Sequence, residues 1–322
     1  MDDVTGYSPD YVPSHDTFAR VFQLLSNEGM RQLLRDIAYI ISESIPDNHK
    51  IEGLACDGKA LRGTIDEENK ILYVLNVWST KYDLCVYQIP ISTKTNEITA
   101  MPNALRLLNI KGKVITFDAL NTQKKIIAYI SDNGAYYIAP LKENHKTAYE
   151  EISKYLNDYM TKRKADFIIT TKGHGRTETR KIWQTADVKW FQDIGDWKGL
   201  CTIAVIECER TENKTNTTSI TRSYFISNMK KDPEAFLKYK LQHWMFETGH
   251  NVLDVTMNED FNKTKNKNAA SNLSIMRVCA LNLIKKFKNT DERYCKRSIK
   301  SVQNRAARDK ETLLKILFGF CA

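Results

Sequence analysis

The sequence predicts an α/β protein with a mixed five-stranded sheet, flanking helices and a mostly β insertion that interrupts the sheet. Three observations lead to this fold class. Three short segments rich in apolar and β-branched residues follow one another early in the chain, which is typical of an antiparallel meander. Two more such segments then alternate with helical patterns, which is typical of strands linked through helices. A second group of strand-like segments, in residues 166–228, breaks that alternation.

Residues 1–50 are expected to form an N-terminal helical region. Ser14 and Asp16 are residue types that cap helices, and apolar residues such as Phe18, Val21 and Phe22 recur at helical spacing over residues 14–44. Pro46 is expected to end this region, because proline cannot continue a helix.

Residues 51–165 are expected to form the first part of the core. The predicted meander strands are Ile51–Asp57, Ile71–Ser79 and Leu84–Ser92, and Gly58 is expected to break the chain after the first. The elements predicted after them are a helix over Glu97–Leu108, a strand over Lys113–Ala119, a helix over Thr122–Asp132, a strand over Ala135–Leu141 and a helix over Asn144–Met160. A three-strand meander followed by helix-linked strands is the ribonuclease-H-like order.

The rest of the chain is expected to hold a β-rich insertion and a helical end. The insertion, residues 166–228, has predicted strands at Phe167–Thr171, Glu178–Thr185, Leu200–Glu209 and Ser219–Ser227. Residues 229–322 are expected to complete the core and to add basic C-terminal helices. The helices predicted there are Pro233–Val252, Asn272–Phe287 and Val302–Phe318.

The composition excludes several classes of protein. Hydrophobic residues make up 42% and charged residues 27%, as in an ordinary soluble domain. No run approaches the roughly 20 apolar residues of a membrane span, and the acidic start of the chain lacks the apolar region of a signal peptide. The seven cysteines are widely spaced and form no CxxC pair, which argues against a zinc ribbon or a disulfide framework. We therefore expect a cytoplasmic protein without membrane contact.

The positive charge gathers in the last fifth of the chain. Residues 261–322 hold fifteen Lys and Arg against four Asp and Glu, while the whole chain has a formal net charge of +9. A basic C-terminal region on a nearly neutral body favours a polyanionic partner, most often nucleic acid. A lysine-rich solvated helical surface would give the same count, so charge alone leaves both open.

Two aspartates follow buried-type strands of the predicted core. Asp57 is expected to end the first strand, and Asp118 lies near the end of the fourth. These strands are neighbours in a ribonuclease-H-like sheet, so the two carboxylates would meet and repel each other unless a divalent cation bridged them. Oxygen-only ligands suit Mg²⁺ or Mn²⁺, and two such ions can stabilise the attacking and leaving oxygens in phosphoryl transfer.

A third acid is expected from the helix that follows the insertion. His243, Glu247, His250 and Asp254 fall at helical spacing and give this helix one polar face. Glu247 could complete the metal site. Two other interpretations use the same residues: Glu247 and His250 match half of a di-iron motif, although no second half exists, and His243, Glu247 and His250 could hold zinc.

These residues resemble the H-repeat-associated, ISAs-type bacterial insertion-sequence transposases, which are DDE enzymes. The resemblance extends over most of the chain in a fixed order of short motifs. The matching stretches are Pro13–Phe18 with Val21 and Phe22, Asp57–Gly63, Asn96–Ala100, Thr116–Ala119 with Gln123, Leu141 and Lys142 with Asn144, His174–Arg180, His243 and Trp244 with Glu247, Leu253–Val255, Asn258–Asp260, and Asn268–Ala270 with Asn272.

The resemblance implies a DNA transposase with a catalytic triad of Asp57, Asp118 and Glu247. It implies cleavage and strand transfer at the ends of a DNA element and insertion into target DNA, with two ions of Mg²⁺ or Mn²⁺ held by the same three acids. It also implies a homodimer and a place in the bacterial cytoplasm at the nucleoid. Candidate DNA contacts are Lys59, Arg62, Lys142, His174, Arg176, Arg180 and His243.

Two departures from the family pattern leave other functions open. Only twelve residues precede Pro13, and the stretch after Glu247 is one residue shorter than the pattern. Losing one residue from a helix turns everything beyond it by about 100°. The alternatives are an impaired or adapted remnant that binds DNA without cutting it, and a metal-dependent nuclease without strand transfer. A pure protein-interaction module is less favoured, since it would not need acids at neighbouring strand ends.

Overall fold

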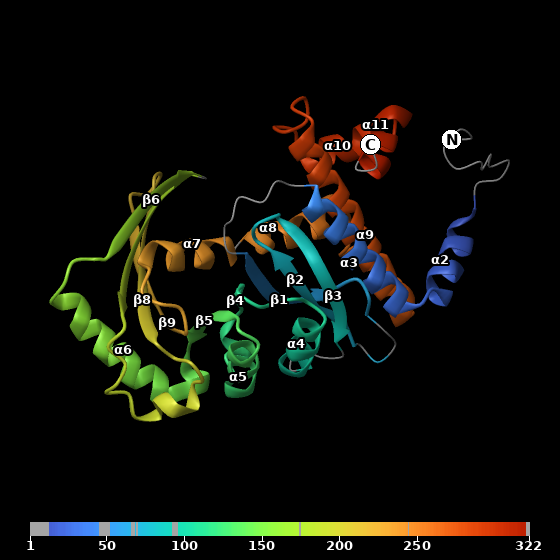
Figure 1. Ribbon diagram of the computed structural model, residues 1–322. Coiled ribbons are helices and arrows are strands. Elements are labelled where there is room, and N and C mark those ends of the chain that lie inside the picture. The colour runs from blue at the N-terminus through green and yellow to red at the C-terminus, as the bar shows by residue number, and fades with distance from the viewer. Residues whose placement is uncertain are drawn as a thin grey trace. The chain divides into compact units, whose positions relative to one another are not determined.

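A computed structural model describes residues 13–44, 52–65, 68, 70–91, 96–173, 175–243 and 245–319 (Figure 1). The chain divides into two compact units. The first unit contains Met1–Lys50, Gly58–Ala100 and Met245–Ala322, and the second contains Ile51–Asp57 and Met101–Trp244. Strand β1 (Gly53–Leu61) and helix α4 (Glu97–Arg106) each continue from one unit into the other.

All nine strands of the described chain lie in one mixed sheet, in the order β3-β2-β1-β4-β5-β9-β8-β7-β6. The bounds of the strands are Gly53–Leu61 for β1, Leu72–Ser79 for β2, Leu84–Ile91 for β3, Val114–Thr116 for β4, Tyr136–Leu141 for β5, Phe167–Gly173 for β6, Arg176–Thr185 for β7, Thr202–Glu212 for β8 and Thr218–Ser227 for β9. Strand β1 pairs in parallel with β4, and β4 in parallel with β5. The prediction that the first and fourth strands are neighbours is confirmed.

The strands of the predicted insertion extend the sheet. Strand β9 pairs antiparallel with β5, and β8, β7 and β6 follow in an antiparallel series. Four of the nine strands in the described part of the chain therefore come from the segment predicted as a β-rich insertion. The apolar pattern of the sequence predicted these strands. It did not predict that they pair with the β5 edge of the sheet.

The first unit packs helices against the meander strands. Helices α3 (Asn27–Glu43) and α9 (Lys267–Thr290) both contact β3, and α9 also contacts β2. The predicted single helical region over residues 14–44 is two helices, because the Ser26 side chain caps α3 by accepting a hydrogen bond from the Gly29 amide. Helix α2 (His15–Leu24) precedes this cap.

The second unit builds its core between the extended sheet and α7 (Pro233–His243). Phe236 and Leu237 of α7 are buried against Val114 of β4 and Phe225 of β9, among others. Helices α5 (Lys124–Asp132) and α6 (Lys146–Thr161) contact β5 and the strand pair β8–β9, respectively.

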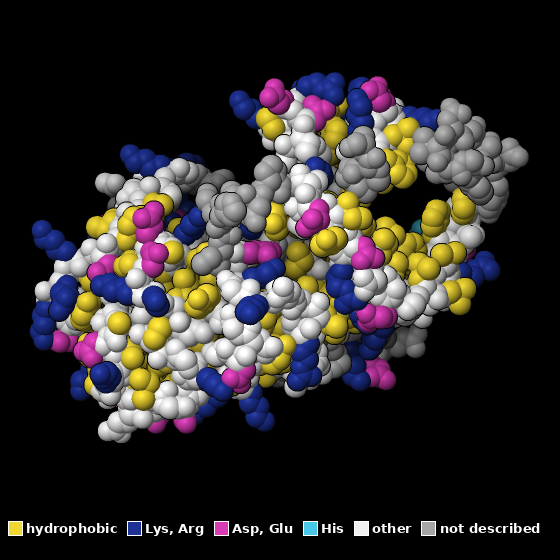
Figure 2. Space-filling model, in the orientation of Figure 1, with side chains coloured by type: hydrophobic (Ala, Val, Ile, Leu, Met, Phe, Trp, Pro, Cys, Tyr) yellow, Lys and Arg dark blue, Asp and Glu magenta, His cyan; other side chains and the backbone are white. Residues whose placement is uncertain are grey.

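The helices of the C-terminal region are more divided than the sequence predicts. The predicted helix Pro233–Val252 is α7 followed by α8 (Met245–Asn251), and a π-helical turn, Val252–Thr256, continues α8. The predicted helix Val302–Phe318 is α10 (Ile299–Ala306) and α11 (Lys310–Phe318), because the Asp309 side chain caps α11 at the Thr312 amide. Lys and Arg side chains are prominent over α10 and α11 (Figure 2). No helix in the described parts of the chain is long and apolar enough to cross a membrane.

Candidate metal centre

The register of β1 against β4 brings Asp57 and Asp118 to equivalent positions. Ala55 is paired with Thr116 in this parallel ladder, and each aspartate lies two residues further along its strand direction. Because paired residues of parallel strands advance together, the two carboxylates lie side by side. Asp57 lies inside β1 rather than at its end, since the strand runs on through Gly58 to Leu61. The prediction that Gly58 ends the strand is therefore wrong.

The carboxylate of Asp118 is held by the turn that follows β4. Its Oδ1 accepts hydrogen bonds from the Asn121 backbone amide and from Asn121 Nδ2, both at 3.1 Å. Asp118 is thereby the cap of a 3-10 turn over Ala119–Asn121. These two hydrogen bonds fix the orientation of the Asp118 carboxylate just beyond the end of β4. A carboxylate held in one orientation is a better metal ligand than a mobile one.

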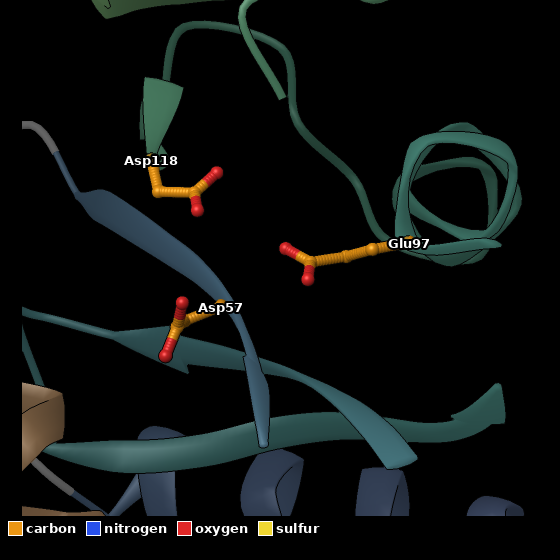
Figure 3. Close-up of side chains that lie close together, drawn as sticks. All are labelled: Asp57, Glu97 and Asp118. Atoms are coloured by element: carbon orange, nitrogen blue, oxygen red, sulfur yellow. The ribbon is translucent and has the colours of Figure 1, made fainter. Parts of the chain in front are cut away.

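A third carboxylate in this cluster comes from Glu97, the first residue of α4. One carboxylate oxygen from each of Asp57, Glu97 and Asp118 lies within 4.8 Å of the other two, and Figure 3 shows the three side chains directed toward one another. Glu97 is only 1% exposed. Its position depends on Gly58, because a Cβ atom at Gly58 would lie 2.8 Å from Glu97 Cδ.

No pattern in the sequence was sufficient to identify Glu97 as a site residue. An acidic residue at the start of a helix is common, because it interacts favourably with the positive end of the helix dipole. The stretch Asn96–Ala100 was among the motifs of the family resemblance, which was the available hint. Only the fold shows that this glutamate is buried beside two aspartates.

Three carboxylates at this distance repel each other in the absence of a cation. Their oxygen-only donor set fits a hard divalent cation such as Mg²⁺ or Mn²⁺. Neither His243 nor His250 belongs to this cluster, which is the one group of potential metal ligands found among the described residues. The geometry of the described acids thus supports the oxygen-ligand interpretation.

The predicted third acid, Glu247, lies on α8, and its side chain is outside the described part of the structure. The later residues of this helix pack on the sheet of their unit. Gly249 packs directly against the ring of Trp78, where a Cβ atom would lie 2.8 Å from a ring carbon. His250 Nε2 lies 3.0 Å from Asn76 Nδ2 on β2.

His250 is a neutral, half-buried hydrogen-bond acceptor. Asn76 Oδ1 accepts a hydrogen bond from Gln88 Nε2 at 2.8 Å, so the Asn76 amide nitrogen is left to donate to His250 Nε2. Burial, reinforced by the nearby positive charge of Lys59, lowers the pKa of His250 to about 3. The ring therefore carries its proton on Nδ1 and stays uncharged at neutral pH.

Two predicted DNA contacts, Lys59 and His243, are buried among protein partners. Lys59 is 6% exposed, and its ammonium group binds Asp254 Oδ1 at 2.6 Å and also Glu259 Oε2. His243 Nδ1 lies 2.9 Å from Thr116 Oγ1, and burial lowers the pKa of this imidazole well below its ordinary value. Neither side chain presents a charge to a phosphate in this arrangement.

The other predicted DNA contacts differ in exposure. Arg180 is buried and Arg176 half-buried, and both pair with Glu178 on the same strand. Arg62 and Lys142 are exposed. His174 lies outside the described residues. Arg62 and Lys142 are thus the predicted cations that the structure leaves most accessible to a polyanion.

Comparison with known proteins identifies the family. Residues 57–283 match the family model described as "Transposase DDE domain". The chain belongs to the DDE transposases. The matched range begins at Asp57 and includes Glu97, Asp118 and Glu247, so all four candidate metal ligands lie within the transposase domain.

Individual relatives support the same assignment. The chain is 31% identical to "H repeat-associated putative transposase YhhI" of Escherichia coli K12, with 96% of this chain and 81% of the relative covered. It is also 31% identical to "Putative transposase YncI" of E. coli O157:H7, covering 86% and 72% of the two chains. A Xanthobacter autotrophicus protein from the dhlA 3′ region is 33% identical, covering 69% and 74%. The predicted H-repeat-associated resemblance of this transposase is confirmed.

Proposed function

We propose that this transposase cuts DNA at the ends of an insertion sequence and joins those ends to target DNA, using divalent metal ions. The observation that carries the proposal is the parallel pairing of β1 with β4, which sets Asp57 and Asp118 side by side inside the transposase domain. The strand order β3-β2-β1-β4-β5 supports a ribonuclease-H-like core, because a meander is followed by two parallel strands in that order.

The acids of this core fit Mg²⁺ or Mn²⁺, and two ions are the expected number. Asp57 and Asp118 would hold them, with Glu97 from the structure and Glu247 from its motif position as further ligands. Bound divalent ions supply a nucleophile at neutral pH and neutralise the charge that develops on the phosphate oxygens. The chain's own part is to fix the carboxylates in place, which Asn121 does for Asp118 and the absence of a side chain at Gly58 does for Glu97.

DNA would be bound through exposed cations rather than through the buried ones. Arg62 and Lys142 are exposed, and the C-terminal helices carry further exposed lysines and arginines. Phosphate contacts of this kind give binding that weakens steeply with salt. We further propose a homodimer acting on double-stranded element ends and target, in the bacterial cytoplasm at the nucleoid, as the family resemblance implies.

A DNA-binding remnant without cleavage is the second candidate. The observation that favours it is the π-helical turn Val252–Thr256, which falls where the stretch after Glu247 is one residue shorter than the family pattern. A π turn changes the phase of the residues that follow. The remnant would retain salt-sensitive DNA binding and would lack metal-dependent cleavage.

The test is a nicking assay on supercoiled plasmid carrying the DNA that flanks this gene, with Mg²⁺ or Mn²⁺. Site-specific nicks that also yield joined strands, and that disappear in Asp118→Asn, would support the transposase. Cut strands without joined products would indicate a nuclease. Salt-sensitive binding with no metal-dependent nicks would indicate the remnant.

A further inference from the structure

The turn that holds Asp118 lies beside the loop that follows β5. Residues 119–122 form this turn, here called the Asp118 turn, and its Asn121 amide donates to the Asp118 carboxylate. On the strands before them, Thr116 of β4 is paired with Ile138 of β5 in a parallel ladder. Because paired residues of parallel strands advance together, the chain leaving β4 runs beside the chain leaving β5.

Side-chain hydrogen bonds join the Asp118 turn to β5 and its loop. Asn144 Nδ2 donates to the Ala119 carbonyl at 2.7 Å, and His145 Nε2 is bonded to the Thr122 carbonyl. A carbonyl oxygen can only accept, so the His145 ring carries a proton on Nε2. Thr122 Oγ1 in turn donates to the Pro140 carbonyl on β5 at 2.7 Å. The turn is therefore attached at its first residue and at its last.

The peptide unit that carries the Asn121 amide is also held from its carbonyl side. Gln123 Nε2 donates to the Leu120 carbonyl at 3.0 Å. The Leu120 carbonyl and the Asn121 N–H belong to one planar peptide unit, so a hydrogen bond to the carbonyl sets the direction of the N–H. That N–H donates to Asp118 Oδ1 at 3.1 Å. Gln123 thus orients the donor that holds the carboxylate.

We infer that Gln123, Asn144 and His145 are positioning residues that hold the Asp118 carboxylate in the orientation in which it binds a divalent cation. This inference rests on the proposed function, because it takes Asp118 as a metal ligand. All three side chains lie in the same compact unit as Asp118 and Asp57. A carboxylate that is already oriented loses less conformational freedom when it binds an ion, so its support raises the affinity.

Mn²⁺ binding to the full-length chain, followed by electron paramagnetic resonance, tests the inference without requiring cleavage. Groups behind metal ligands typically change affinity or activity by about 10–100-fold, so Asn144→Ala/His145→Ala should weaken Mn²⁺ binding by about tenfold or more. Unchanged affinity in this double variant, beside weakened binding in Asp118→Asn, would overturn positioning and leave the proposed metal site intact. Absence of Mn²⁺ binding to the wild type would refute both.

A conservative replacement of His145 shows whether its hydrogen bond or its bulk matters. Glutamine carries an amide N–H that can take the place of the His145 Nε2–H, whereas alanine has no donor. Asn144→Ala/His145→Gln should therefore bind Mn²⁺ more tightly than Asn144→Ala/His145→Ala. Equal Mn²⁺ affinities of the two double variants would overturn the inference for His145.

A matched control separates positioning from general stability. Asn228 holds the opposite end of β5, where its Oδ1 accepts from the Tyr137 amide at 2.7 Å and its Nδ2 donates to the Ala135 carbonyl at 2.9 Å. Asn228→Ala removes a comparable attachment and should leave Mn²⁺ affinity within about twofold of the wild type, because distant sites act independently. A loss as large as that of Asn144→Ala/His145→Ala would overturn the inference.

A second variant covers the case in which the double variant does not fold. If circular dichroism shows that Asn144→Ala/His145→Ala has lost its structure, Gln123→Ala provides the same test, because it removes the hydrogen bond to the Leu120 carbonyl alone. Gln123→Ala should fold and bind Mn²⁺ more weakly than the wild type. Wild-type Mn²⁺ affinity in folded Gln123→Ala would then overturn the inference.

DNA binding without metal distinguishes positioning from direct contact. Asparagine and glutamine side chains often donate to phosphates, so Asn144 and Gln123 could instead touch DNA. Positioning predicts that Asn144→Ala and Gln123→Ala bind duplex DNA in EDTA within about twofold of the wild type, because no contact with the duplex is lost. Weakened DNA binding in EDTA together with unchanged Mn²⁺ affinity would identify them as DNA contacts and overturn the inference.

Discussion

The absence of a side chain at Gly58 makes room for the carboxylate of Glu97. A Cβ atom at Gly58 would lie 2.8 Å from Glu97 Cδ, closer than real Cβ atoms approach other atoms. No positive φ is involved at this glycine, so the requirement is one of space and not of backbone conformation. The residue after the first aspartate therefore determines where the buried glutamate can lie.

Gly58→Ala should displace Glu97 and weaken metal binding without unfolding the protein. We expect an affinity loss of at least about tenfold for Mn²⁺, the scale seen when a ligand's support is removed, and a similar loss for Glu97→Gln. Isothermal titration calorimetry of the purified variants measures both. Gly173→Ala is a suitable control, because nothing lies within 4 Å of a Cβ atom built there. Equal affinities for Gly58→Ala and wild type would remove Glu97 from the metal centre.

Metal ions should reverse the stability order of wild type and Asp118→Asn. Without divalent ions, the asparagine relieves repulsion between neighbouring carboxylates and can still accept the Asn121 hydrogen bonds, so the variant should be the more stable. With free Mg²⁺ at about a hundred times its dissociation constant, the wild type should gain about 2.7 kcal/mol and become the more stable. Thermal unfolding with and without EDTA tests this. Parallel shifts of both proteins would contradict it.

The hydrogen bond between Thr116 and His243 should contribute measurably to stability. Thr116→Val keeps the shape but removes the hydroxyl, and a lost buried hydrogen bond costs about 1–3 kcal/mol. Thr116→Ser keeps the hydroxyl and should lose less. Urea unfolding gives both free energies. Equal losses in the two variants would mean that the methyl packing of Thr116 matters and the hydrogen bond does not.

His250 should make the protein less stable as the pH falls below 6.5. Its pKa is about 3 in the folded protein against 6.5 for an ordinary histidine, so between these values the unfolded chain binds a proton that the folded chain does not. The contribution of the neutral His250 ring to the free energy of unfolding is fully present above pH 6.5. Between pH 6.5 and about 3 it falls by about 1.4 kcal/mol for each pH unit. His250→Gln should lower the slope of unfolding free energy against pH by one proton between pH 6 and 4. An unchanged slope would show that the folded protein protonates this ring readily.

The sequence predicted the pairing of the central strands better than the partners of individual side chains. Strand order and type followed from apolar patterning, and that was enough to bring Asp57 and Asp118 together. The continuation of β1 was missed because a glycine in a strand resembles a break unless the glutamate that packs on it is known.

The burial of Lys59 was beyond sequence reasoning for a related reason. Its partner Glu259 is 200 residues away along the chain, and a lysine near a catalytic motif resembles a phosphate contact until that partner is seen. The attachment of β9 to β5 depends in the same way on tertiary pairing, which no local pattern encodes.

Cleavage of a labelled duplex with the flanking DNA sequence, followed across Mg²⁺ concentration for wild type and Asp118→Asn, tests the central claim most directly. The account predicts no cleavage in EDTA, saturable cleavage with Mg²⁺, and a loss of at least about a hundredfold in the variant, while both proteins bind the duplex within about twofold of each other. Cleavage that persists in EDTA, or that is equal in the two proteins, would contradict the account.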